Sequence, residues 1–403
     1  MVYILSIHCS HDASAAVYSD YDVIAAVQLE RLTRKKNDGY RVPVEAVDEV
    51  LEIAGLERAE IDVISLTRGE YPSRYIQKDF RRDPLGSLYR AATDILHSII
   101  LRRPKKRNLL TAQRRQRRRH SVEVFACSKF KKDYGFHRDA EIFFPHHHEA
   151  HALAALFYAG ARNVLAYTAD GGGDNLFYSV CTLQDGVVTT RVGGEDQVFQ
   201  PMRIHSLGRA YALMTEALGY KRNRHEGKLT GLAAFGDPKA LQDMLNHFWV
   251  DEDGEIASDF SSHEEMQHFL ATAIKNLSKA DAAASIQVAL ETLIQRSVRF
   301  HLARTGLADL ALAGGVFANV RLNKVLADLP EVESCFVFPA MGDEGLVNGA
   351  ALQYLLARDG PQAWTLQRRR LDNVYWGKAS HAAEPPFAAF DEVERIATED
   401  AAA

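Results

Sequence analysis

The chain has 403 residues, which is enough to bury one large core or two lobes. Hydrophobic residues make up 47% and charged residues 25% of the sequence, as in ordinary soluble globular proteins. The net charge of −5 gives no global attraction to nucleic acid or to an anionic membrane, so neither is expected as a partner.

The four cysteines are scattered without a CxxC pair, which argues against a disulfide framework or a thiolate zinc site. The amino-terminal segment 2–5 is apolar but has no basic leader and soon reaches His8 and His11, so it is not expected to be a signal peptide. The sequence contains no apolar run of about 18 residues, the length that predicts a membrane span. These features predict a cytoplasmic enzyme.

Two segments of the chain follow the same pattern of strands and turns. Residues 2–29 are expected to form three strands joined by turns at 10–12 and 20–22, and residues 163–193 repeat this order with turns at 170–174 and 185–186. Largely helical sequence follows each triple. A copy that recurs after about 160 residues indicates a duplicated lobe rather than a solenoid. Two unrelated α/β domains are the alternative.

Two lobes of βββαβα type that face each other across a cleft form the actin, hexokinase and heat-shock ATPase superfold. The sequence therefore predicts an α/β, duplicated RNase H-like two-lobe fold with lobe I at 1–160, lobe II at 161–360 and a carboxy-terminal tail at 361–403. Basic runs between 102 and 119 are typical of a solvated helix face or a mobile insertion. A patch for an anionic partner is the alternative interpretation of these runs.

A histidine pair, His147 and His151, lies in an expected helix that starts near Pro145 and ends near Gly160. Histidines four residues apart lie on one helix face, so both imidazoles can reach one ion. Asp343 follows the expected strand 335–338 on a loop, where a carboxylate could complete the set. Two His and one Asp with open coordination positions suit Fe(II) or another divalent metal better than a closed zinc site. Histidines satisfied in the core or at the surface are the alternative.

Two turns at equivalent places in the duplicated pattern could face an anion through their main-chain N–H groups. The first contains His11, Asp12 and Ser14. In the second, glycines let the backbone approach a phosphate without a Cβ in the way. Its residues are Asp170, Gly171, Gly172, Gly173 and Asp174. A glycine run is equally typical of a tight hairpin.

Two further stretches carry candidate binding and acid/base groups. An apolar strand runs into Gly314 and Gly315 and then into a helix near Asn319, an arrangement that permits close approach of a flat ring or a ribose. Glu226 could accept a proton from a hydroxyl, and Lys228 could offset phosphate charge. An ordinary strand–helix turn and a charged surface turn are the respective alternatives.

These motifs together resemble the NodU/CmcH/TobZ family of O-carbamoyltransferases and, more distantly, the YgjD-type tRNA threonylcarbamoyl-transfer proteins. The resemblance covers roughly residues 1–355. The matching stretches, in the order of the family, are HDASAAV (11–17), ERLTRKKNDG (30–39), HHEAHALAALFYAG (147–160), ADGGGD (169–174), HSLGRAY (205–211), HEGKLTGLAAFGDP (225–238), AGGVFANVRLN (313–323) and GDEGLVNGAAL (342–352).

The resemblance implies an enzyme that moves the carbamoyl group of carbamoyl-adenylate to a hydroxyl of a sugar or specialised metabolite, with AMP leaving. It implies a metal on His147, His151 and Asp343 that polarises the mixed anhydride. It also implies proton handling by His11, Asp12 or Glu226, phosphate contacts from Lys228 and 171–173, and adenosine contacts from Gly314, Gly315 and Asn319. A homodimer is a further expected partner state.

The chain departs from the family near its end. Complete members continue into a YrdC-like domain that makes carbamoyl-adenylate from ATP and carbamoyl phosphate. Residues 373–378 resemble the entry to that region, but the sequence then changes to Ala, Glu and Pro, so 361–403 is interpreted as a remnant of the linker. Gln28 also stands where the family pattern suggests an acidic residue.

Three functions are compatible with the sequence. The chain could receive carbamoyl-adenylate from a separate YrdC-like protein and catalyse the transfer. It could instead be a catalytically incomplete, nucleotide-binding regulatory or scaffold module. A sugar kinase of the same superfold would fit the two phosphate turns but leaves the His-His-Asp set unexplained.

Overall fold

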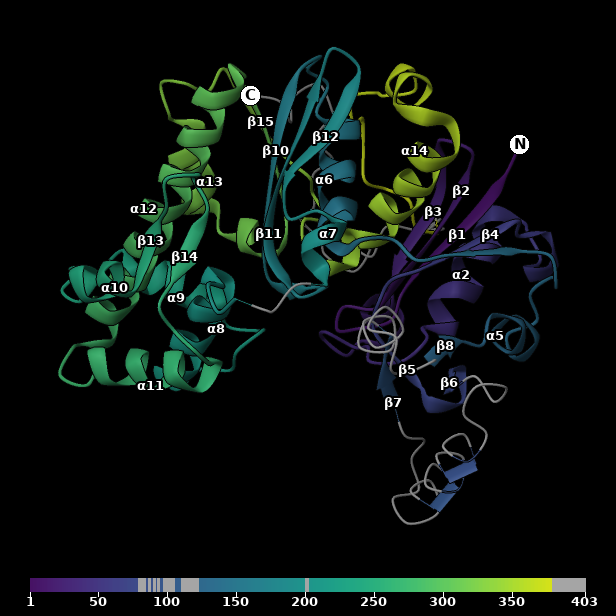
Figure 1. Cartoon of the computed structure of the whole chain (residues 1–403), viewed down its shortest axis with the longest axis horizontal. Coiled ribbons are helices and arrows are strands. Elements are labelled where there is room, and N and C mark those ends of the chain that lie inside the picture. Colours follow the sequence, from purple (N-terminus) through teal and green to yellow (C-terminus); the bar gives the residue numbers. More distant parts are fainter. Residues whose placement is uncertain are drawn as a thin grey trace, which may run out of the picture.

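Two five-stranded sheets with the same strand order form the frame of the computed structural model (Figure 1). The structure describes residues 1–78, 106–109, 123–199 and 203–378, with isolated positions between 85 and 96. The first sheet has the order β3 (Asp22–Gln28), β2 (Ser14–Ser19), β1 (Tyr3–His8), β4 (Val63–Leu66), β9 (Glu141–Phe143). The second has the order β12 (Val187–Val192), β11 (Leu176–Gln184), β10 (Val164–Gly173), β15 (Asp309–Ala313), β16 (Ser334–Val337).

Both sheets pair their strands in the same way. The first three strands of each sheet form an antiparallel meander, and the fourth and fifth run parallel to the first. Leu5 thus pairs with Val17 and Ile64, and Ala166 pairs with Cys181 and Ala311. This repeated topology confirms the predicted duplication and the RNase H-like, two-lobe ATPase fold.

Two helices occupy the space between the sheets. Helix α6 (His147–Tyr158) packs on the second sheet, and α14 (Leu346–Leu366) packs on the first sheet and on α6. Their residues share one core with the facing sides of both sheets, including the fully buried Phe157 and Trp364. The chain therefore passes between the sheets twice. Helix α6 lies before residue 160 but packs on the second sheet, so the boundary between the lobes at residue 160 stays a prediction.

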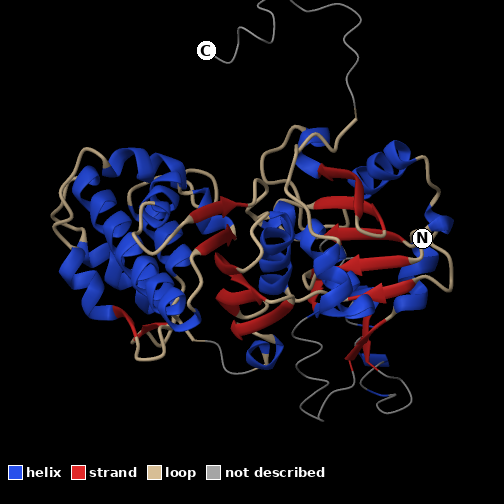
Figure 2. Ribbon diagram, turned by 90° about the horizontal axis from the view of Figure 1, so that it is seen from above, coloured by secondary structure: helices blue, strands red, loops and turns tan. Residues whose placement is uncertain are grey.

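The outer faces of both sheets are covered by other helices (Figure 2). Helix α2 (Val44–Ala54) packs on the first sheet, and α8 (Leu207–Ala217) packs on the second, backed by α12 (Lys279–Thr305). The other α-helices of the described ranges are α1 (Leu29–Thr33), α5 (Cys127–Asp133), α7 (Glu195–Val198), α9 (Glu226–Ala233), α10 (Leu241–His247), α11 (His263–Ala273) and α13 (Val320–Ala327).

Short elements complete the described chain. The 3-10 helices are η1 (Arg58–Glu60), η2 (Ser73–Tyr75), η3 (Gly315–Ala318) and η4 (Asp343–Gly345). Two-stranded sheets pair β5 (Glu70–Pro72) with β7 (Lys106–Asn108), β6 (Ile76–Lys78) with β8 (Glu123–Phe125), and β13 (Phe248–Val250) with β14 (Ile256–Ser258). Apart from Lys106–Asn108 and the residue after it, the predicted basic runs lie outside the described residues. Within the described ranges, no helix combines the length and apolar character required to cross a bilayer.

The segment expected as a tail from residue 361 stays packed on the fold as far as Trp376. Helix α14 kinks at Gly360 and continues to Leu366, and the Trp364 indole N–H donates to the Leu352 carbonyl (3.0 Å). Ala26 N–H of β3 then donates to the Trp376 carbonyl (3.0 Å). The buried indole accounts for this order, because burying a large apolar side chain contributes about 1.5–3 kcal/mol. Residues 379–403 lie outside the described residues.

The contact between α6 and α14 generates the first prediction. A Cβ added to Gly349 would lie 1.6 Å from the Ala150 carbonyl oxygen, so the two helix backbones would have to separate. We expect Gly349→Ala to lower the free energy of unfolding in urea by about 1–3 kcal/mol. Gly231→Ala in α9 is the matched control, since an added Cβ meets nothing within 4 Å there. It should be neutral or stabilising by up to about 1 kcal/mol. Equal effects of both variants would contradict the close helix contact.

Candidate metal centre

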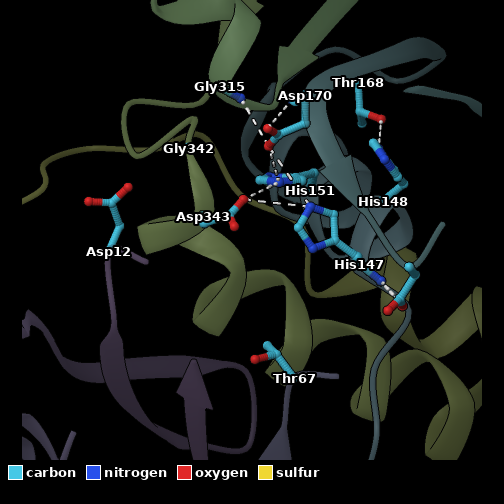
Figure 3. A network of polar contacts seen from close by, with 12 residues as sticks. Asp12, Thr67, His147, His148, His151, Thr168, Asp170, Gly315, Gly342 and Asp343 are labelled. Atoms are coloured by element: carbon cyan, nitrogen blue, oxygen red, sulfur yellow. Dashed lines mark hydrogen bonds and ion pairs between the residues drawn. The ribbon is translucent and has the colours of Figure 1, made fainter. Parts of the chain in front are cut away.

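Four side chains converge between the two lobes (Figure 3). Each of His147, His151, Asp170 and Asp343 offers one ligand atom, and these atoms all lie within 4.8 Å of one another. Asp343 Oδ1 lies 3.6 Å from Nε2 of both histidines. Asp170 Oδ2 lies 3.4 Å from Nε2 of His151 and 3.9 Å from Nε2 of His147. The predicted His-His-Asp set therefore meets in space, together with Asp170.

The chemistry of this cluster fits a divalent cation. Nε2 of His147, Nε2 of His151 and Oδ1 of Asp343 are buried and make no hydrogen bond, which is costly for polar atoms. Ligand atoms about 2.0–2.1 Å from a tetrahedral ion lie about 3.4 Å apart, close to the observed separations. Two imidazoles and two carboxylates suit Fe(II) and related divalent ions. We therefore take the four residues as a candidate metal site.

Local structure at the start of α6 aims the two imidazoles. His146 is the N-cap and its ring accepts a hydrogen bond from Glu149 N (3.0 Å), and the His147 N–H donates to Asp174 Oδ2 (2.9 Å). A Cβ on Gly173 would lie 2.2 Å from the His147 ring, so only glycine lets the turn lie against it. His148 points elsewhere and pairs with Thr168 Oγ1 (2.9 Å). The helix thus presents His147 and His151 alone to the cluster.

The other oxygen of Asp343 faces lobe I. Asp343 Oδ2 lies 3.4 Å from His11 Nε2 and 3.7 Å from His8 Nε2. His11 Nδ1 contacts Asp12 Oδ2 (3.0 Å), and His8 is fixed by Thr67 Oγ1 (2.9 Å) and by the His11 carbonyl (3.0 Å). The predicted His11–Asp12 pair therefore reaches the cluster through Asp343. His8 was not predicted, because as a strand residue it carries no motif.

Burial and neighbouring charges shift the pKa values of these groups in opposite directions. Burial alone would raise the pKa of Asp343, but His147 and His11 hold it below its usual value. Burial lowers the pKa of His8 to about 4. It also acts to lower the pKa of His11, but Asp343 and Asp12 raise it to about 10. The cluster is thus a buried set of carboxylates neutralised by histidine, a charge arrangement typical of functional sites.

A buried arginine of lobe I forms ion pairs with two carboxylates of lobe II. Arg68, which follows β4, donates from both terminal nitrogens to Glu195 (2.9 Å each) and from Nη1 to Asp174 Oδ2 (3.2 Å). Its side chain is 7% exposed and that of Asp174 is 1% exposed. Asp174 Oδ2 is also the acceptor for the His147 N–H. Arg68 therefore positions the first turn of α6 through Asp174, the residue that we predicted for the phosphate turn.

The glycine turns lie beside the cluster. Gly315 N–H donates to Asp170 Oδ2 (3.3 Å), and Gly314 N–H donates to the Met341 carbonyl (2.7 Å). Gly314 has φ 100°, and a Cβ there would lie 2.2 Å from the Ala169 carbonyl oxygen, so glycine is required. Asn319 caps α13 through Leu322 N (3.1 Å). The predicted adenosine stretch thus borders the metal site, and its ligand contacts remain a prediction.

The remaining predicted site residues have other contacts. Ser14 Oγ donates to the Glu344 carbonyl (2.9 Å), next to Asp343. Glu226 opens α9 and accepts from Asn223 N (2.5 Å), and Lys228 Nζ lies over the Tyr220 ring at 5.6 Å. Among the described contacts, none joins Glu226 or Lys228 to the metal cluster. Their catalytic and phosphate roles stay predictions.

One family model matches most of the chain, including the four residues of the metal cluster. The model described as Carbamoyltransferase N-terminus matches residues 3–352. The nodulation protein NolNO of Sinorhizobium fredii is 28% identical over 382 residues, covering 91% of this chain and 49% of that protein. The nodulation protein NolO of Bradyrhizobium diazoefficiens is 30% identical over 244 residues, covering 57% and 41%. The chain thus spans about half the length of these curated relatives.

The fold also has a solved counterpart. Full-length HypF in its phosphate- and nucleotide-bound form aligns with a TM-score of 0.53 at 12% identity, covering 90% of this chain and 47% of that one. At this identity the similarity shows the fold alone.

The metal cluster generates the second prediction. We expect Asp170→Asn to weaken binding of Fe(II), or of Mn(II) as an air-stable substitute, by about 10- to 100-fold, because one anionic ligand is lost. Titration calorimetry of the metal-free protein measures this change. Glu149→Gln is the matched control, since Glu149 lies on α6 but pairs with Thr190 and Gln353. Unchanged affinity in Asp170→Asn would remove Asp170 from the site.

The Arg68 network generates the third prediction. Arg68→Ala leaves the Asp174 carboxylate buried without its cation, so we expect a loss of about 3–5 kcal/mol in urea unfolding and weaker Mn(II) binding. Arg68→Lys should restore part of the stability and most of the metal affinity. Arg41→Ala, which breaks an exposed pair with Glu45, should cost about 1 kcal/mol or less. A metal affinity unaffected by Arg68→Ala would contradict the positioning role.

Proposed function

The chain belongs to the carbamoyltransferase family, as a domain of the carbamoyltransferase amino-terminal type, and we propose that it transfers the carbamoyl group of carbamoyl-adenylate to a hydroxyl of a sugar or specialised metabolite. The observation that carries this proposal is the convergence of His147, His151, Asp170 and Asp343 beside the His11–Asp12 pair. Such a site can hold a divalent ion next to groups that accept a proton.

In the proposed reaction the acceptor hydroxyl oxygen attacks the carbamoyl carbon. The bond between that carbon and the phosphate oxygen breaks, and AMP leaves with the bonding electron pair. A carbamate ester and one proton are the other products. No oxidant or reductant is needed, which agrees with a site that is built from histidine and carboxylate groups.

The chain's own residues supply the proton path. Asp12, His11 and Asp343 form a row of contacts of 3.0 and 3.4 Å that leads from the lobe I turn to the metal cluster. Without a metal, Asp343 and Asp12 keep His11 protonated, since they raise its pKa to about 10 despite its burial. A divalent ion bound by Asp343 would offset that carboxylate charge, so that the His11–Asp12 pair could then take up the proton released by the acceptor, a step that typically contributes 10²–10⁴-fold to a rate. Glu226 is the less favoured base, because its carboxylate accepts from Asn223 N at the start of α9.

Binding of the nucleotide is assigned to lobe II. The turn at residues 171–173 lies against the cluster, and Lys228 is the proposed cation for the phosphate. The N–H groups of Gly171 and Gly315 already donate to the Asp170 carboxylate. A divalent ion held by His147, His151, Asp170 and Asp343 would supply Lewis-acid polarisation of the carbamoyl or phosphate oxygen. Carbamoyl-adenylate made from ATP and carbamoyl phosphate by a YrdC-like protein is the proposed co-substrate.

Supplying carbamoyl-adenylate to the purified chain tests this function. With Fe(II) and a panel of sugar acceptors, we expect AMP and carbamate ester in equal amounts, measured by chromatography and mass spectrometry. His11→Asn should lower the rate about 100-fold with unchanged Mn(II) affinity. His268→Asn, a change at an exposed histidine of α11, should leave the rate unchanged.

Two results would contradict the proposal. Binding of AMP without turnover of carbamoyl-adenylate, even with metal, would favour the regulatory or scaffold function. Phosphoryl transfer from ATP to a sugar would favour the kinase, although a kinase leaves the buried histidine pair without a role.

A further inference from the structure

The turn that carries His11 and Asp12 joins β1 to β2 in a strained backbone conformation. Asp12 has φ 54°, in the left-handed region that costs a residue other than glycine roughly 1–2 kcal/mol. Such a conformation persists only where the surrounding structure holds it in place. The contacts around this turn therefore identify the residues that fix the His11–Asp12 pair.

His8 supports the turn from the interior of lobe I. It is the last residue of β1, and its side chain is 3% exposed. Because a carbonyl oxygen can only accept a hydrogen bond, His8 Nε2 donates to the His11 carbonyl (3.0 Å). His8 Nδ1 contacts Oγ1 of Thr67, which follows the neighbouring strand β4 (2.9 Å). A buried imidazole is costly without such partners, so these two contacts fix the ring between the strand ends and the turn.

The loop after α1 supports the same turn from its outer side. The Asn37 side-chain amide donates to Asp12 Oδ1 (2.8 Å), and the Tyr40 N–H donates to the Ser10 carbonyl (2.8 Å). A Cβ on Gly39 would lie 1.9 Å from the Ser10 carbonyl oxygen, so only glycine lets the loop lie this close to the turn. The turn is therefore held between His8 on one side and this loop on the other.

The position of the turn decides where the two nitrogens of His11 point. His11 Nδ1 donates to Asp12 Oδ2 (3.0 Å), and His11 Nε2 lies 3.4 Å from Asp343 Oδ2. A carboxylate at Nδ1 keeps a proton on that nitrogen, so Nε2 is the nitrogen that is directed at the metal cluster. A displaced His11 backbone would change both contacts. His8 itself is buried and its Nε2 is engaged by the His11 carbonyl, so it acts on the cluster through His11.

We propose that His8 is a positioning residue, which holds the His11 carbonyl and thereby aims His11 Nε2 at the metal cluster. Asn37 supports the pair from the outer side by fixing the Asp12 carboxylate. The effect of His8 on catalysis rests on the proposed function. Its effect on the orientation of His11 rests on the contacts of the turn and can be tested without turnover.

NMR of the whole metal-free chain with 15N-labelled histidine tests this orientation. The proton between His11 Nδ1 and Asp12 should give a low-field resonance, which His11→Asn identifies by its absence. His8→Leu removes the donor to the His11 carbonyl and should abolish this resonance, whereas His8→Gln keeps an N–H donor and should retain it. His301→Leu is the matched control, because His301 is similarly buried (4% exposed) but lies in α12 of lobe II.

A second variant tests the turn from its outer side and stays informative if His8→Leu does not fold. Asn37 has φ 58°, which glycine adopts without strain, so Asn37→Gly removes the donor to Asp12 and leaves the backbone of the loop unchanged. We expect the low-field resonance to be lost in this variant too.

Kinetics separates positioning from a general loss of structure. His8→Leu should lower kcat for carbamoyl transfer about 10- to 100-fold, as is typical when a supporting contact of a functional histidine is removed. The KM for carbamoyl-adenylate and the Mn(II) affinity should stay unchanged, because His8 is buried beneath the turn. His8→Gln should recover most of kcat.

Three results would overturn the positioning role. One is a low-field resonance that persists in His8→Leu, or in Asn37→Gly where His8→Leu does not fold. The second is an equal loss of the resonance in His301→Leu. The third is a parallel fall of kcat and Mn(II) affinity in His8→Leu, which would place the effect at Asp343. If the resonance responds as expected but the unmodified chain leaves carbamoyl-adenylate intact, the proposed function is wrong and the positioning of His11 stands.

Discussion

The carboxylate of Asp343 is the contact on which the centre of this molecule depends. One oxygen faces His147 and His151 of the helix between the sheets, and the other faces His11 of the first lobe. Because Asp343 is buried, its charge is tolerated only while histidines or a metal ion neutralise it. The late loop, the helix and the first turn must therefore fold against one another, and any ligand in the cleft meets a group from each lobe.

Arg68 extends this constraint to the backbone. Its guanidinium joins Asp174 and Glu195 of the second lobe, and Asp174 in turn accepts the first free N–H of α6. A metal ligand on a helix is only as well placed as the first turn of that helix. Since Gly173 lies against the His147 ring, the turn, the arginine and the helix fix one orientation of the imidazole together. This arrangement explains why a glycine-rich turn, which we interpreted as a phosphate loop, also supports the metal site.

The duplicated fold and the histidine pair could be predicted from the sequence, because strand–turn–strand spacing and an i, i+4 spacing are local signals. Asp343 became a candidate through its place on a loop after an expected strand and through the family resemblance. Asp170 was assigned to the phosphate turn instead. Its position depends on β10 lying beside β15, a pairing between strands far apart in the chain. His8 lies at the end of a strand without any motif, and the order of 361–376 depends on burial of Trp364 in a core shared by both sheets. Such contacts are set by tertiary packing, which no local pattern encodes.

The two carboxylates of the cluster are held in different ways. On the lobe II side the N–H groups of Gly171 and Gly315 donate to Asp170, so backbone groups fix this candidate ligand. On the lobe I side Asp343 Oδ2 faces His11, whose Nδ1 contacts Asp12. Backbone N–H groups keep their charge at every pH, whereas an imidazole beside a carboxylate can gain or lose a proton. A change of charge at the centre is therefore answered first on the lobe I side, where His11 and Asp12 can redistribute a proton, while the geometry at Asp170 stays the same.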